Sequence, residues 1–113
     1  MKKILIADDE VDCRHSFKNY FFKRDVWVHM AFDGAEAKHF LEGNSYDDIF
    51  FDCNMPELSG IELLEVIRET NPKAKKVMIS GYELINEDFV KASGVDLFLR
   101  KPIALKDMER IIV

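Results

Sequence analysis

Acidic side chains follow two of the short apolar runs in this sequence. The run at residues 4–7 leads directly into three consecutive acids at 8–10, and the run at 49–51 leads into Asp52, with Pro56 marking a turn soon afterwards. A lone aspartate after a strand most simply begins a turn. Three adjacent acids repel one another, however, and turn geometry alone does not require them. The pattern therefore directs attention to chemistry at the ends of these runs.

Two further polar side chains follow other apolar runs. Ser80 comes directly after residues 77–79, and Lys101 lies shortly after residues 97–99. Carboxylates that crowd together either raise a pKa or bind a cation, and an all-oxygen site suits Mg²⁺. Mg²⁺ and Lys101 would neutralise the oxygens of a phosphoryl group, and Ser80 would donate a hydrogen bond to it. One carboxylate could then act as the nucleophile and form an acyl phosphate.

The elements that would position these groups are short apolar runs typical of buried strands. They alternate with helical patterns at intervals of roughly 20 to 27 residues, which is the rhythm of repeated βα units. We predict an α/β fold with a doubly wound, flavodoxin-like, five-stranded parallel sheet in the order 2-1-3-4-5. Strands one and three are then neighbours, which brings Asp8, Asp9 and Asp52 together. The predicted strands lie at residues 4–7, 26–30 (an edge strand), 49–51, 77–79 and 97–99.

Helical patterns separate the predicted strands. Asp33 is expected to cap one helix, with Glu36 at capping-box spacing and Gly43 at its end. The helix that follows Ser59 is amphipathic, and its inner face is predicted to hold Ile61, Leu64 and Ile67. The helical patterns cover residues 13–21, 33–43, 59–70, 82–93 and 105–112.

Composition narrows the class of protein. A chain of 113 residues predicts one domain over residues 1–113 with no effector domain. The formal net charge of -5 argues against a nucleic-acid binder, and the lysine cluster at 73–76 is expected to be a solvated loop. No apolar run approaches the ~18 residues of a membrane span. Cys13 and Cys53 suggest buried packing residues in a reducing compartment, so we expect a cytoplasmic protein.

Several short motifs occur in an order and spacing that together are specific. They are residues 6–10 (IADDE), 51–56 (FDCNMP), Gly60 at the start of a helix, 78–81 (MISG) and 98–102 (FLRKP). With these motifs the chain resembles, over nearly its whole length, the response regulator receiver domain of two-component signalling. The resemblance implies a (βα)5 fold, Mg²⁺ as cofactor, and a sensor histidine kinase or phosphotransfer protein as partner. It implies a signalling domain that catalyses only its own phosphorylation and autodephosphorylation, and it leaves phosphorylation-dependent homodimerisation open.

The resemblance also assigns roles to the acids. Asp52 matches the family's phosphoacceptor, which takes its phosphoryl group from a phosphohistidine. Asp9 and Asp52 match the metal-ligating carboxylates, and Asp8 acts partly through water. The backbone carbonyl of Asn54 completes the protein's share of the metal shell.

The remaining matches concern the switch that reads the phosphoryl group. Ser80 matches the switch hydroxyl, which moves toward the phosphoryl group, and Phe98 matches the switch aromatic, whose ring turns inward behind it. The implied output is the face built from the fourth helix, the fifth strand and the fifth helix. Lys101 and Pro102 match a peptide that is usually cis, and the positions of Asn54 and Tyr82 influence the phosphoryl lifetime.

Three other readings are weighed against this one. A hydrolase with an aspartate nucleophile would need a second acid in a D-x-D arrangement, but Asn54 stands there. A flavodoxin-like binder of FMN or a nucleotide would show a glycine-rich phosphate loop, which the sequence lacks. A degenerate receiver is disfavoured because the acids, Ser80 and Lys101 are all present. The three histidines, at 15, 29 and 39, are not at metal-ligand spacing.

Overall fold

Five strands form a parallel sheet in the order β2-β1-β3-β4-β5 in the computed structural model, which describes residues 2–10, 25–52, 58, 60–81, 94–101 and 105–112. The predicted strand order is confirmed, and each strand includes its predicted apolar run and extends beyond it. The strands are β1 (Lys2–Ala7), β2 (Val26–Ala31), β3 (Asp48–Asp52), β4 (Lys75–Ser80) and β5 (Leu97–Arg100).

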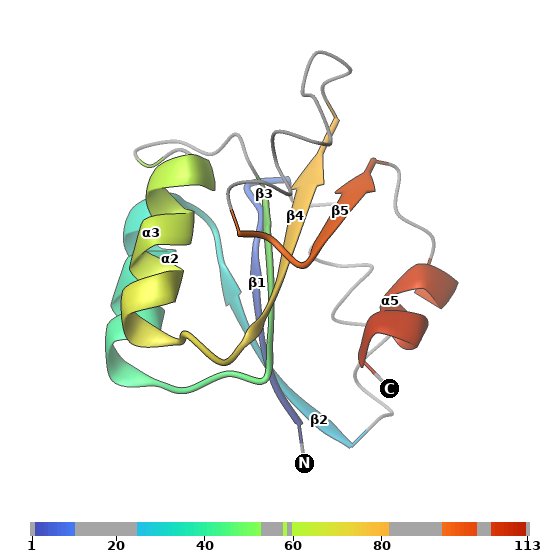
Figure 1. Cartoon of the computed structure of the whole chain (residues 1–113), viewed down its shortest axis with the longest axis horizontal. Coiled ribbons are helices and arrows are strands. Elements are labelled where there is room, and N and C mark those ends of the chain that lie inside the picture. The colour runs from blue at the N-terminus through green and yellow to red at the C-terminus, as the bar shows by residue number, and fades with distance from the viewer. Residues whose placement is uncertain are drawn as a thin grey trace.

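The described helices lie on both sides of the sheet, as a doubly wound fold requires. Helices α2 (Gly34–Gly43) and α3 (Gly60–Thr70) cover one face, and α5 (Leu105–Ile112) lies on the other (Figure 1). The helices predicted over 13–21 and 82–93 fall outside the described residues. None of the helices that are described is long and apolar enough to cross a membrane.

The sheet carries an apolar core on each face because successive strand residues point to opposite sides. Leu5 and Phe51 belong to the core beneath α2 and α3, together with Leu64 and Ile67. β3 is buried at every position, as expected for a central parallel strand. The core on the α5 side contains Ile4, Ile6, Phe50, Val77, Ile79 and Ile111.

β2 forms one edge of the sheet, as its alternating sequence predicted. Trp27 is 40% exposed on this strand. His29 Nδ1 lies 2.7 Å from the hydroxyl oxygen of Tyr46, and the imidazole stacks on Phe40 with ring centroids 4.7 Å apart. Burial and the charge of Lys3 lower the pKa of His29. These contacts give His29 a packing role.

The predicted cap of α2 is confirmed. The backbone N–H of Glu36 donates to Asp33 Oδ1 at 2.8 Å, and the helix ends at Gly43. The return bond reaches one residue further back than a capping box predicts, because Glu36 Oε1 accepts from the N–H of Phe32 at 3.2 Å.

The predicted inner face of α3 is wrong at one position. Leu64 and Ile67 are buried as expected, but Ile61 is 43% exposed. The buried stripe instead runs through Gly60, Leu63, Leu64 and Ile67, which is regular helical spacing. Ile61 lies next to this stripe in sequence and is therefore rotated toward solvent.

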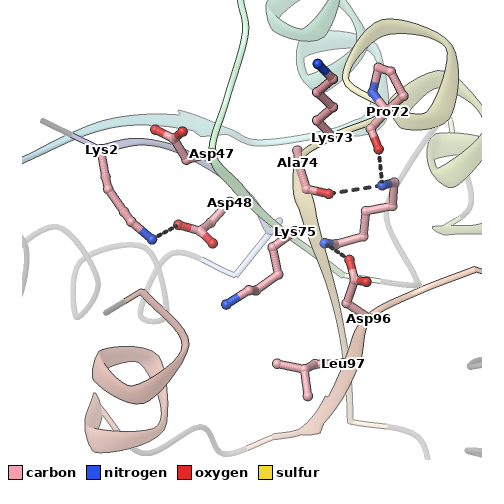
Figure 2. A pocket seen from close by; sticks show the side chains of 10 residues that line it. Lys2, Asp47, Asp48, Pro72, Lys73, Ala74, Lys75, Asp96 and Leu97 are labelled. Atoms are coloured by element: carbon pink, nitrogen blue, oxygen red, sulfur yellow. Dashed lines mark hydrogen bonds and ion pairs between the residues drawn. The ribbon is translucent and has the colours of Figure 1, made fainter.

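The lysine cluster at 73–76 is only in part the solvated loop that the sequence predicted, because Lys73 is exposed in a turn but the other two lysines are not. β4 already begins at Lys75, and Lys76 is only 8% exposed. The Nζ of Lys76 donates to the carbonyl oxygens of Pro72 at 3.1 Å and Ala74 at 3.0 Å, and its backbone N–H donates to Asp96 Oδ2 at 2.8 Å. These bonds border a pocket of about 660 Å³ at the amino ends of the strands (Figure 2).

Two glycines of α2 offer a test of packing at its two ends. A Cβ at Gly34 would overlap the side chain of Leu58, whereas a Cβ at Gly43 would meet nothing. We expect Gly34→Ala to destabilise the fold by about 1–3 kcal/mol through overpacking. Gly43→Ala should leave stability unchanged or raise it by up to about 1 kcal/mol, because alanine favours the helix. Urea unfolding compares the two variants, and equal midpoints would contradict the overlap.

Candidate functional site

The carboxyl ends of the parallel strands bring the predicted site residues to one edge of the sheet. Asp8 follows β1, Asp52 is the last residue of β3, Ser80 ends β4, and Lys101 follows β5. β1 and β3 are adjacent, and Ser80 is paired in register with Arg100. Asp8, Asp52 and Ser80 are buried. The sheet order therefore produces the convergence that the sequence predicted.

The Lys101 ammonium lies at the centre of this group. Its Nζ is 2.7 Å from Asp52 Oδ2, 2.5 Å from Glu10 Oε1 and 3.4 Å from Asp8 Oδ1. Burial alone would lower the pKa of Lys101, but the hydrogen bonds to Asp52 and Glu10, together with the charges of Asp8 and Asp52, raise the pKa above its usual value. Lys101 therefore stays cationic and links the end of β5 to the ends of β1 and β3.

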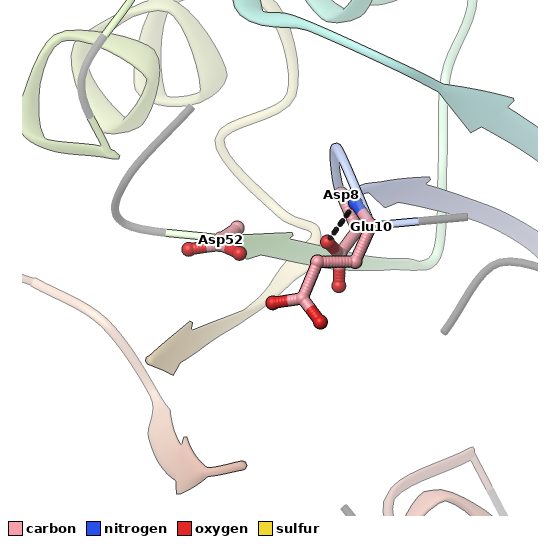
Figure 3. Close-up of side chains that lie close together, drawn as sticks. All are labelled: Asp8, Glu10 and Asp52. Atoms are coloured by element: carbon pink, nitrogen blue, oxygen red, sulfur yellow. Dashed lines mark hydrogen bonds between the residues drawn. The ribbon is translucent and has the colours of Figure 1, made fainter. Parts of the chain in front are cut away.

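Asp8 is the most enclosed of these acids, with 0% of the residue exposed. Its Oδ1 accepts the backbone N–H of Glu10 at 2.9 Å (Figure 3). Its Oδ2 is buried and receives no hydrogen bond within the part of the chain that the structure describes. Burial raises the pKa of Asp8, and the charge of Asp52 adds to this, while the Glu10 hydrogen bond and Lys101 oppose it. A buried carboxylate oxygen without a donor is suited to a cation.

The acids fit a hard divalent ion. Asp8, Glu10 and Asp52 each offer an oxygen atom, and the three atoms lie within 4.8 Å of one another. Figure 3 shows these side chains gathered at the ends of β1 and β3. Oxygen-only ligands at this spacing suit Mg²⁺, which retains several waters in such sites. These residues could therefore hold the magnesium that the sequence predicted.

The structure and the sequence analysis differ on which acids of residues 8–10 share the pocket. Asp9 is exposed and does not belong to the group within 4.8 Å, whereas Glu10 does. The chain bends at Asp9, and the backbone N–H of Glu10 donates to Asp8 Oδ1 at 2.9 Å, so this turn brings Asp8 and Glu10 together. The signal available in the sequence for Glu10 was its place in the run of three acids. The role of Asp9 as a ligand stays a prediction, and Asn54 lies outside the described residues.

The two predicted switch residues are both buried. Ser80 is 0% exposed, and its carbonyl oxygen accepts the backbone N–H of Lys101 at 2.9 Å. Phe98 is 7% exposed and belongs to the core on the α3 side. The guanidinium carbon of Arg100 lies 5.9 Å from the centroid of the Phe98 ring. The ring therefore occupies an inward position in this structure.

Some predicted features fall on residues that are not described. The cis peptide was predicted between Lys101 and Pro102, and Pro102 lies outside the described ranges. The same holds for His15, Cys13, Cys53, Asn54 and Tyr82.

Comparison with known proteins gives a consistent result. A family model described as response regulator receiver domain matches residues 4–113. Response regulator MprA of Mycobacterium sp. (strain KMS) is 28% identical over 107 residues, which cover 94% of this chain and 46% of that protein. Regulator of RpoS of Escherichia coli (strain K12) is 34% identical over 112 residues, covering 97% of this chain and 32% of that protein. The chain spans about half the length of these relatives or less.

Several solved receiver domains have the same architecture as this chain. The receiver domain of the Francisella response regulator 1452 has a TM-score of 0.89 and 31% identity, covering 99% of this chain and 93% of that one. The receiver domain of a Pseudomonas aeruginosa sensor histidine kinase, with magnesium coordinated in its active site cleft, has a TM-score of 0.85 and 23% identity, covering 98% and 93%. A Saccharomyces cerevisiae response regulator receiver, crystallised with a histidine phosphotransfer protein, has a TM-score of 0.87 and 22% identity, covering 98% and 86%.

The buried charge of Asp8 should lower the stability of the metal-free protein. Because its folded pKa lies above the usual 3.8, the folded state binds more protons than the unfolded state, and stability falls as pH rises through this interval. We therefore expect Asp8→Asn to be more stable than wild type near neutral pH in EDTA, by about 1 kcal/mol. The difference should vanish once the pH falls below about 3.8.

Urea unfolding at several pH values in EDTA measures this difference. Asp9→Asn, which removes the adjacent but exposed acid, is the control and should behave as wild type. A loss of stability in Asp8→Asn at neutral pH would show that Lys101 fully compensates the buried carboxylate.

Proposed function

This chain belongs to the response regulator receiver domain family, and on that premise we propose that Asp52 accepts a phosphoryl group from the phosphohistidine of a sensor histidine kinase or phosphotransfer protein. The observation that carries this proposal is the placement of Asp52 beside Lys101 and within 4.8 Å of an oxygen of Asp8, whose Oδ2 receives no hydrogen bond from the described residues. The Asp52 carboxylate therefore has the Lys101 ammonium beside it and a candidate Mg²⁺ site next to it.

The proposed reaction is a transfer between two side chains. A carboxylate oxygen of Asp52 attacks the phosphorus, the P–N bond to the donor histidine breaks, and an aspartyl phosphate forms. Mg²⁺, when bound by Asp8, Asp52 and other oxygen ligands of the pocket, supplies positive charge that offsets the charge of the phosphoryl oxygens. Lys101 donates to the same oxygens from its position at the end of β5. Hydrolysis of the aspartyl phosphate within the same pocket returns Asp52 to its starting state.

The neighbours found by comparison support the cofactor and the class of partner. The Pseudomonas receiver holds magnesium in its active site cleft, and the yeast receiver binds a histidine phosphotransfer protein. By analogy we assign this chain Mg²⁺ and a phosphohistidine-bearing partner. We further propose that residues 1–113 act as a single receiver domain and that it works in the cytoplasm.

The output is proposed to be a shift between two conformations. Ser80 would donate to the phosphoryl group, and the space it leaves would stabilise the inward position that Phe98 already occupies in this structure, at the expense of an outward position. Phosphorylation can favour this state only through its differential interaction with the two conformations. The changed surface would include β5, which contains Phe98, and α5, which follows Lys101 in the sequence.

The phosphoacceptor is tested by intact-protein mass spectrometry after incubation with acetyl phosphate. We expect wild type to gain one phosphoryl group only in the presence of Mg²⁺, and Asp52→Asn to gain none. Asp48→Asn is a matched control because Asp48 is a buried aspartate at the other end of β3. Labelling of Asp52→Asn at the same site would refute the assignment.

Lys101 is proposed to couple phosphorylation to the conformational change. We expect Lys101→Ala to retain Mg²⁺ binding, because the carboxylates remain, but to lose most of its response to the phosphoryl group. NMR spectra with and without beryllofluoride, a phosphoryl mimic, measure that response at Ser80 and Phe98. Chemical-shift changes as large as those of wild type would argue against this role.

A further inference from the structure

Glu10 contacts two members of the pocket from a single position. Its backbone N–H donates to Asp8 Oδ1 at 2.9 Å, and its side-chain Oε1 lies 2.5 Å from Lys101 Nζ. The Glu10 side chain is 56% exposed, whereas those of Asp8 and Asp52 are 0% and 6% exposed. Glu10 is therefore the carboxylate at the mouth of the pocket, with Lys101 between it and the buried acids.

Lys101 and a divalent ion require the same buried carboxylates. The ammonium already contacts Asp52 at 2.7 Å and Asp8 at 3.4 Å. A second cation bound to these two acids repels the ammonium and competes for their charge. Lys101 is only 12% exposed, so an ammonium displaced from both acids would be costly unless another anion remained beside it. Glu10 is positioned to be that anion.

Resting on the proposed function, we propose that Glu10 is a positioning residue for Lys101 that eases the entry of Mg²⁺. The Glu10 carboxylate holds the ammonium at the mouth of the pocket. Lys101 can then loosen its contacts with Asp8 and Asp52 as the metal binds without losing all anionic partners. In the phosphorylated state the same contact keeps Lys101 within reach of the phosphoryl oxygens.

Removal of the Glu10 charge should therefore leave the Lys101 ammonium more tightly bound to Asp8 and Asp52. In Glu10→Gln the ammonium keeps Asp8 and Asp52 as its only charged partners among the contacts described, and Mg²⁺ must displace it from both. A direct role of Glu10 as a metal ligand would also weaken Mg²⁺ binding when the charge is removed. The two explanations separate only when Lys101 is absent.

A double-mutant cycle provides this separation. Mg²⁺ dissociation constants are measured by calorimetry and by NMR titration for wild type, Glu10→Gln, Lys101→Ala and the double variant. We expect Glu10→Gln to raise the Kd by about two- to fivefold, the usual range for a partly exposed ion pair. In the Lys101→Ala background the same change should leave the Kd unaltered. Glu42→Gln, which removes an exposed charge near the far end of α2, should match wild type.

The ammonium itself gives a second readout that does not depend on activity. In wild type, the ¹⁵N resonance of Lys101 Nζ should be visible at low temperature, because its protons are held in hydrogen bonds, and should remain visible when Mg²⁺ is added. In Glu10→Gln the resonance should be lost on Mg²⁺ addition as the ammonium is released to solvent.

Each alternative result has a defined meaning. An equal loss of Mg²⁺ affinity in both backgrounds would overturn the inference and make Glu10 a direct contributor to the metal site. An unchanged Kd in Glu10→Gln would also overturn it, and the proposed function would stand if wild type still bound Mg²⁺ and was phosphorylated. Absence of Mg²⁺ binding by wild type would overturn the proposed cofactor together with this inference.

Discussion

The contact of one buried ammonium with three carboxylates is the interaction on which the site depends. Lys101 lies within 3.4 Å of oxygens from Asp8 and Glu10, which follow β1, and from Asp52, which ends β3 far along the sequence. Without that ammonium, the like charges of the buried acids would face each other in a poorly solvated pocket. The parallel sheet makes the contact possible, because it brings the ends of β1, β3 and β5 to one edge. The strand order therefore determines which charges meet, and Lys101 offsets the repulsion between the acids that the strand order brings together.

Much of the architecture was predictable because buried parallel strands leave a simple signal. Both faces of such strands are covered, so their sequences are short continuous apolar runs. The edge strand β2 was recognisable because apolar and more polar residues alternate along it more than along the other strands. The predictions for Ile61 and Lys76 were wrong because the type of residue did not determine whether the side chain is buried or exposed. Ile61 is apolar but lies one residue outside the buried stripe of α3. Lys76 is cationic but buried, because neighbouring carbonyl oxygens accept its hydrogen bonds.

The site was predictable to the extent that it follows from strand ends. Asp8, Asp52, Ser80 and Lys101 each follow or end an apolar run, so the sheet order alone implied their convergence. Glu10 was not singled out because it belongs to a run of acids in which residue type carries no information about direction. A turn after β1, in which the Glu10 N–H donates to Asp8 Oδ1, brings Glu10 rather than Asp9 into the group of acids within 4.8 Å. The inward position of Phe98 depends on core packing around it and could not be read from the local sequence.

The net negative charge of the pocket explains why the proposed reaction would need a divalent cation. Three carboxylates and one ammonium leave two net negative charges when all the acids are ionised. An anionic phosphoryl donor approaching this pocket would be repelled, and burial, which raises the pKa of Asp8, already makes that carboxyl costly to ionise. One Mg²⁺ would bring the group to neutrality before the phosphoryl group arrives. Lys101 alone cannot do so, because its single charge is shared among three anions, and this is why its placement between Glu10 and the buried acids matters for the metal.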